Sequence, residues 1–105
     1  MNETVKNALL SCTQNVYNYT ARGNKSVPYV VYGNDGENVF RSGDHRSERA
    51  DQGTVDLYTK TASDPLIRAI PRALDTAGVA VYLNSVQYED EAGLLHYEWV
   101  YEAVA

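Results

Sequence analysis

Apolar residues recur near the start of the chain at the spacing of an amphipathic helix. Over residues 3–15 they fall on one face of a helix, and polar residues fall on the other. The apolar positions are Val5, Ala8, Leu9, Cys12 and Val16. Asn2 or Thr4 can cap the start of this helix. We expect an extended segment to follow over residues 16–19.

Three segments rich in β-branched and aromatic residues come next and predict strands. They are "PYVVYG" at 28–33, "ENVFRS" at 37–42 and "GTVDLYTK" at 53–60. The sequence "GNDG" at 33–36 predicts a turn between the first two strands. The charged sequence "FRSGDHRSERADQG" at 40–53 connects the second strand to the third. We expect most of it to be a loop.

A second helix is predicted by the sequence "ASDPLIRAIPRALDTAG". Asp64 is a good N-cap, Pro65 suits the first helical position and Gly78 can end the helix. Pro71 lies inside this segment, where proline removes a backbone hydrogen bond and crowds the preceding turn. We therefore expect a kink at Pro71 or a helix that starts later.

The chain closes with a predicted hairpin whose strands span 79–89 and 94–104. In the second of these strands, apolar and polar residues alternate, which indicates one packed and one wetter side. The element order is α-β-β-β-α-β-β. It predicts a single α+β domain over residues 1–105. In this domain two helices pack on one face of an antiparallel sheet of about four to five strands.

Composition and charge narrow the range of functions. The chain has 105 residues, a net charge of −5 and no basic cluster outside the 40–53 segment, which disfavours nucleic-acid binding through phosphates. No apolar run approaches a membrane span. The nine tyrosines, against one phenylalanine and one tryptophan, suggest half-buried positions that include subunit interfaces. Alternatively, they reflect the preference of strands for aromatic residues.

Side chains capable of catalysis or metal binding form no recognisable motif. There is no phosphate-binding glycine loop, no zinc-type spacing and no nucleophile elbow. Cys12 is predicted to be a small core residue, and His96 to be a surface residue on the polar side of its strand. Asp56 interrupts an apolar strand. It is predicted to be either an edge charge that blocks unwanted pairing or an ion-pair partner across an interface.

The 40–53 segment is the most charged part of the chain. Asp44, His45 and Glu48 resemble a catalytic set, but the segment has no apolar anchor except Ala50 to hold a general base in place. We expect a mobile loop or loose β-arm that contacts a neighbouring subunit, with charge reversal of Arg46 and Arg49 impairing assembly. The predicted interface residues are Arg41, Asp44, His45, Arg46, Glu48, Arg49 and Asp51.

Several short phrases in a fixed order carry a resemblance to a known group of proteins. "NVYNY" at 15–19, "VPYVVYG" at 27–33, "ADQGTVDLYTK" at 50–60 and "DPLIRAIPRAL" at 64–74 precede a terminal aromatic hairpin. With the element order, they resemble the small tail-completion proteins of long-tailed bacteriophages, the tail terminator and head–tail joining group. The resemblance covers nearly the whole chain.

This resemblance implies a structural, non-enzymatic subunit that forms a ring, typically a hexamer, and uses no cofactor. The ring would cap the tail tube and join it to the head connector in the virion, after assembly in the bacterial cytoplasm. The implied partners are other copies of the chain, the tail tube protein and the head–tail connector protein. No membrane and no sequence-specific nucleic acid is implied. The alternative function is a small cytosolic α+β module that binds a ligand or a protein.

Overall fold

One five-stranded sheet with two helices on one face forms the molecule. The computed structural model describes residues 3–20, 26–41 and 47–104. The strands are β1 (Val16–Asn18), β2 (Tyr29–Arg41), β3 (Ser47–Thr59), β4 (Ala80–Glu89) and β5 (Leu94–Val104), in the spatial order β1-β2-β3-β5-β4. β1 runs parallel to β2, and the other neighbours are antiparallel. The predicted α+β class and element order are confirmed, but the sheet is mixed and not antiparallel throughout, because β1 pairs parallel to β2.

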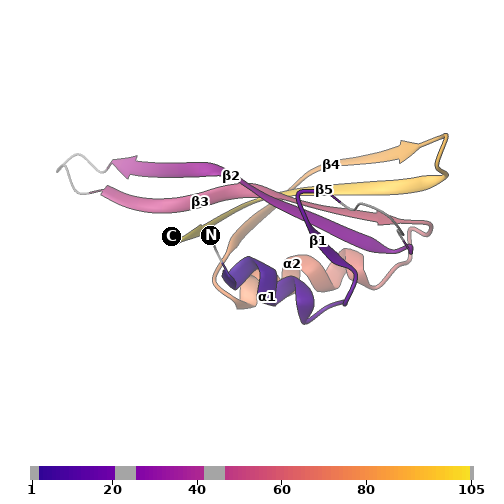
Figure 1. Cartoon of the computed structure of the whole chain (residues 1–105), viewed down its shortest axis with the longest axis horizontal. Coiled ribbons are helices and arrows are strands. Elements are labelled where there is room, and N and C mark those ends of the chain that lie inside the picture. Colours follow the sequence, from indigo (N-terminus) through magenta and orange to yellow (C-terminus); the bar gives the residue numbers. More distant parts are fainter. Residues whose placement is uncertain (1–2, 21–25, 42–46, 105) are drawn as a thin grey trace.

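The hydrophobic core lies between the sheet and the helices α1 (Glu3–Leu10) and α2 (Leu66–Thr76), which lie side by side (Figure 1). Alternate residues of β2, β3 and β5 point toward the helices, as the period of a strand requires. The largest fully buried side chains are Tyr101, Leu9, Leu57, Ile70, Leu74, Val5, Val30, Val55 and Thr59. Burial of each large apolar side chain contributes about 1.5–3 kcal/mol.

α1 ends five residues earlier than predicted, at Leu10. A turn follows, in which the Thr13 amide donates to the Leu9 carbonyl. Cys12 packs against the core, as predicted, with its Sγ 3.5 Å from the carbonyl oxygen of Ala69 on α2. The predicted extended segment forms β1, which begins at Val16.

The signals at both ends of α2 act as predicted. The Oδ1 of Asp64 accepts a hydrogen bond of 2.9 Å from the Leu66 amide, and its Oδ2 accepts one of 2.7 Å from the Thr59 hydroxyl on β3. Gly78 has a φ of +84°, and the amides of Gly78 and Val79 donate to carbonyls of the last helical turn. This is the Schellman arrangement that glycine favours. The Asp64 carboxylate thus links the helix start to the sheet.

Pro71 lies within α2, and the helix runs through it from Leu66 to Thr76. The predicted later start of the helix is therefore wrong. The apolar stripe formed by Leu66, Ile70 and Leu74 is buried on both sides of the proline. Packing of this stripe offsets the backbone hydrogen bond that Pro71 cannot donate.

The first two predicted strands are one continuous strand, β2. The predicted turn at 33–36 is wrong, because this sequence is a β-bulge between Asn34 and Gly36 in the pairing of β2 with β3. Glycine and asparagine suit a bulge as well as a turn. Pairing with the long strand β3 decides between a bulge and a turn. The local sequence of residues 33–36 carries no information about that partner strand.

The charged connection is also shorter than predicted, because β3 begins at Ser47 and not at residue 53. β2 and β3 pair from Tyr29 with Tyr58 to Arg41 with Ser47. β5 ends at Val104 opposite Ala50, so residues 39–41 of β2 and 47–49 of β3 extend past it as two strands. We call residues 36–41 and 47–49 the arm. The arm projects from one end of the molecule, and the β4–β5 turn lies at the other end (Figure 1). The molecule measures 50 × 24 × 24 Å.

Candidate functional site

The face of the sheet opposite the helices carries a row of aromatic and polar side chains. Cross-strand pairing places Tyr29 beside Tyr58, and Tyr58 beside His96. Val30 and Leu57 are buried in the core. Since successive side chains of a strand point to opposite faces, Tyr29, Tyr58 and His96 point away from the helices. In the described part of the chain, no helix covers this open face.

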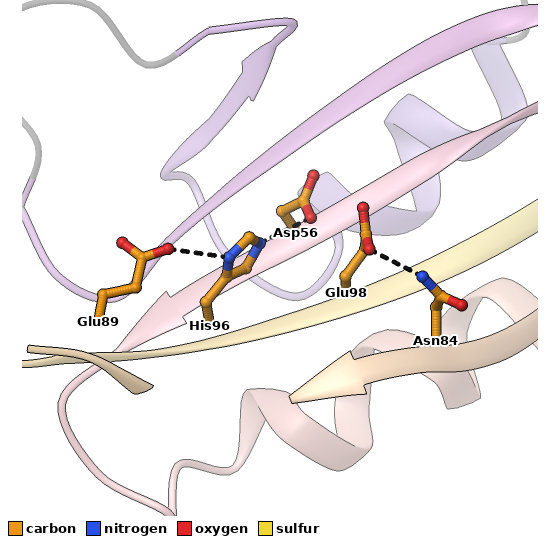
Figure 2. A network of polar contacts seen from close by, with 5 residues as sticks. All are labelled: Asp56, Asn84, Glu89, His96 and Glu98. Atoms are coloured by element: carbon orange, nitrogen blue, oxygen red, sulfur yellow. Dashed lines mark hydrogen bonds and ion pairs between the residues drawn. The ribbon is translucent and has the colours of Figure 1, made fainter. Parts of the chain in front are cut away.

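His96 connects three strands through its imidazole ring (Figure 2). Its Nε2 lies 2.8 Å from Oδ1 of Asp56 on β3, and its Nδ1 lies 3.1 Å from Oε2 of Glu89 on β4. The side chains of His96 and Asp56 are each 16% exposed. The prediction of a surface histidine is therefore wrong, since His96 is the centre of a half-buried network.

This network needs one more proton than a neutral imidazole with two carboxylates provides. A neutral ring has one N–H donor, and ionised carboxylates only accept. Both contacts are therefore hydrogen bonds only when the His96 ring carries two protons or one carboxyl group is protonated. Burial raises the pKa of the Asp56 carboxyl above its ordinary value of 3.8, against the opposing effect of the His96 hydrogen bond. Burial thus favours a proton on this network.

Aromatic rings extend the network across the sheet. The ring of Tyr58 stacks on His96 at a centroid distance of 4.2 Å and on Tyr29 at 4.8 Å. Tyr17 on β1 meets Tyr29 edge to face at 6.3 Å. Burial, followed by the charge of Asp56, raises the pKa of Tyr58 to about 12. The row of ring contacts spans the open face from β1 through β2 and β3 to β5.

The geometry of the network indicates a structural rather than a catalytic or metal-binding role. The two ring nitrogens of His96 point in opposite directions, so Asp56 and Glu89 lie on opposite sides of the ring and do not converge on one point (Figure 2). A triad histidine uses one nitrogen for the nucleophile, and here a carboxylate holds each nitrogen. The described residues contain no group of three side chains placed to hold a metal ion.

A second polar contact lies beside the network, where Asn84 Nδ2 donates to Glu98 Oε1 at 3.0 Å (Figure 2). Asn84 lies at the bulge of β4, where the pairing with β5 shifts register between Leu83 and Ser85. The contact ties the bulge to β5.

Asp56 lies on the central strand β3, so the prediction that it is an edge charge is wrong.

β4 forms one edge of the sheet and exposes large apolar side chains. Its only strand neighbour in the described chain is β5. Tyr82, Leu83, Val86 and Tyr88 are 48–62% exposed. Charged residues and prolines usually protect an edge strand against pairing with another chain. Residues 80–88 contain neither. We call residues 80–88 the β4 edge.

The structure separates the seven predicted interface residues. Asp44, His45 and Arg46 lie outside the described residues. Arg41, Glu48 and Arg49 are backbone positions of the arm. Asp51 lies on β3 opposite Ala103 and is only 8% exposed. No observation tests their role in an interface, which stays a prediction.

The outer surface of α2 carries an open groove of about 530 Å³. It is lined by Pro65, Arg68, Ala69, Arg72 and Ala73. The two arginines are exposed, and among the described residues no polar side chain from another element lines the groove with them. None of the described helices is long and apolar enough to cross a membrane.

Sequence reasoning missed the histidine network because its members are far apart in the chain. Asp56 and His96 are 40 residues apart, and the pairing of β3 with β5 brings them together. One signal in the sequence is that Asp56, Glu98 and His96 all fall on the polar side of their strands, where alternation places polar residues. Another was the interruption of an apolar strand by Asp56. Without the register, these signals do not specify the partners.

Comparisons with known proteins identify a fold and no family. Neither a known protein family nor a curated protein matches this sequence. Among solved structures, the chain is similar to a chain of the virion of a native gene transfer agent particle, with a TM-score of 0.58. The alignment covers 95% of this chain and 90% of that chain at 16% sequence identity. At this identity, the likeness shows a shared fold.

Proposed function

We propose that this chain is a structural subunit of a phage-like particle, in which it forms the ring that caps the tail tube and joins it to the head connector. The observation that carries the proposal is the similarity in fold, over nearly the full length of both chains, to a chain of a gene transfer agent virion. The sequence phrases described above resemble tail-completion proteins and support the same role.

Two features of the molecule support a role in assembly. The β4 edge exposes four large apolar side chains on one unprotected edge strand, and exposed apolar patches mark interaction sites. The polar groups of the open face are used within the chain, with His96 bound to Asp56 and Glu89. The surface thus offers apolar contact area and no arrangement of catalytic groups among the described residues.

Particle assembly without the chain tests this proposal. In a producing cell that lacks the gene, we expect heads and tail tubes that fail to join, with tubes of irregular length. Purified protein added to the lysate should restore joined particles, which electron microscopy counts directly. The proposal is wrong if joined particles form at normal yield without the protein. As a control, the Asp75→Asn variant, changed on the exposed surface of α2, should restore joining as well as the wild type does.

A further inference from the structure

The two edges of the sheet are different in kind. On one side lies the β4 edge, which has ten residues in its strand and four exposed apolar side chains. On the other side, β1 covers only Val30–Tyr32 of β2. From Gly36 to Arg41, β2 pairs with β3 on one side, and no described strand lies along its other side. Each edge therefore offers backbone groups to a further strand.

The arm is placed to reach another molecule. β2 and β3 continue beyond the end of β5, which stops opposite Ala50, so the arm needs no opening of its own sheet to make a contact. It projects at the end of the molecule opposite the β4–β5 turn (Figure 1). Two identical edges favour a closed two-fold pair, whereas joining two unlike edges repeats from copy to copy and forms a ring when the rotation between copies closes.

Charge favours joining the unlike edges. The terminal hairpin, residues 80–104, has five carboxylates and no lysine or arginine, and so carries the whole net charge of −5. Pairing two β4 edges would bring two purely acidic hairpins together, which is repulsive. The arm contains Arg41 and Arg49 in its sequence, beside Glu37 and Glu48. It therefore supplies cations where a second β4–β5 hairpin supplies none.

We infer that the β4 edge binds the β2 edge of the arm of a second copy of this chain, which extends the sheet from one subunit into the next. The backbone of both strands supplies the hydrogen bonds, and the apolar side chains of the β4 edge lie against the incoming arm. The inference rests on the proposed ring and names the surfaces that close it.

Cross-linking of mixed variants tests this contact. In a Cys12→Ala background, Gln87→Cys marks the β4 edge, and Asn38→Cys or Val39→Cys marks the arm. The two arm positions present opposite faces of the strand, so one of them shares the face of Gln87. A bismaleimide of flexible span tolerates a register error of a residue or two. The readout is the covalent dimer on a denaturing gel, with the mass of each untreated sample measured in solution.

We expect a covalent dimer when a β4-edge variant and an arm variant are mixed, and none from either variant alone. A dimer from Gln87→Cys alone would show a two-fold β4 contact and overturn the inference, as would one from an arm variant alone. Rings with no mixed cross-link would overturn the inference and leave the proposed ring standing. Chains that stay monomeric even on tail tubes would refute both.

A charged substitution on the β4 edge provides a second, independent test of the same contact. Val86 is 48% exposed in the single chain, so Val86→Lys should leave folding intact, which circular dichroism checks. It should abolish most of the mixed cross-link. The matched control is Thr76→Lys, at an exposed position at the end of α2, which should cross-link as the parent does. Equal cross-linking by folded Val86→Lys would overturn the inference.

Discussion

His96 shows how one residue couples distant parts of the sheet. Its ring contacts the carboxylate of Asp56 on the central strand and that of Glu89 on the edge strand, and the ring of Tyr58 stacks on it. The network stays complete only while it holds a proton that can be shared between the ring and Asp56. The stability of the sheet should therefore depend on pH through Asp56.

Asp56→Asn removes this titration and keeps an oxygen acceptor for His96. Burial raises the pKa of Asp56 in the folded chain above the 3.8 of the unfolded chain. The folded state then binds more protons in the window above 3.8, so its stability falls as pH rises through that window. Each unit of pKa difference corresponds to about 1.4 kcal/mol. We expect urea unfolding from pH 4 to 7 to show a smaller decline for Asp56→Asn than for the wild type. Parallel curves would contradict the assignment.

Gly53 is fixed by close contacts rather than by its backbone angles. A Cβ at this position would lie 1.9 Å from the carbonyl oxygen of Gly33 and 2.7 Å from the hydroxyl of Tyr101. That hydroxyl, buried in the sheet, donates to the same Gly33 oxygen at 3.2 Å. The Tyr101 side chain passes over β3 at Gly53, and glycine is the only residue type that leaves room for it there.

Gly53→Ala should therefore lower the free energy of unfolding by about 1–3 kcal/mol through overpacking. Gly33→Ala is the matched control. The atoms nearest to its Cβ belong to the ring of Tyr19, at 3.0 Å, and that exposed side chain can shift more easily than the backbone. Chemical denaturation measures both variants. Equal losses for the two would contradict the account of Gly53.

Residue-level prediction from the sequence succeeded where the cause was local. Half-buried rings, which the tyrosine excess suggested, are found at Tyr17, Tyr29, Tyr58 and Tyr97, whereas Tyr32 and Tyr101 are buried and Tyr19, Tyr82 and Tyr88 are exposed. It failed for His96, because the partners of this residue come from strands 40 residues away and from the neighbouring strand of its hairpin. A polar residue on the wetter face of a strand reads as solvated until the pairing is known.

At the scale of elements, Asp64 joins the start of α2 to the end of β3. Its carboxylate caps the helix through the Leu66 amide and accepts from the buried hydroxyl of Thr59. The capping half of this role is visible in the sequence "SDPL", because a cap acts over two residues. The strand half depends on tertiary packing.

Asp64→Ala should destabilise the chain by about 2–3 kcal/mol. Roughly 1 kcal/mol comes from the lost cap, and the rest from leaving the buried Thr59 hydroxyl without its acceptor. Asp64→Asn is the control, since its amide keeps an oxygen for the Leu66 amide and can donate to Thr59. Thermal and urea unfolding compare the two. A cost for Asp64→Ala no larger than for Asp64→Asn would contradict the dual role.

Element boundaries were predictable where caps set them and wrong where long-range pairing did. The ends of α2 and the terminal hairpin follow from Asp64, Gly78 and the "DEAG" turn. The continuity of β2 through "GNDG", and the extension of β3 back to Ser47, arise from pairing between the two strands over their full length. The charged residues at 47–51 resemble a loop by composition, yet their backbone belongs to the sheet.

At the scale of the molecule, an elongated sheet has a free apolar edge on one side and a projecting arm on the other. The order of the strands determines which strand is an edge, and local sequence patterns do not reveal that order. The fold that the sequence phrases implied agrees with the observed architecture, which is shared with a chain of a gene transfer agent virion. Assembly is the function that this arrangement supports.

The most direct measurement of this account is an electron-microscopy average of isolated tails incubated with the purified, tagged protein. The account predicts a ring of this chain at one end of the tube only, with the tag resolved at each subunit. Protein bound along the length of the tube, or absent from both ends while the tails remain intact, would contradict it.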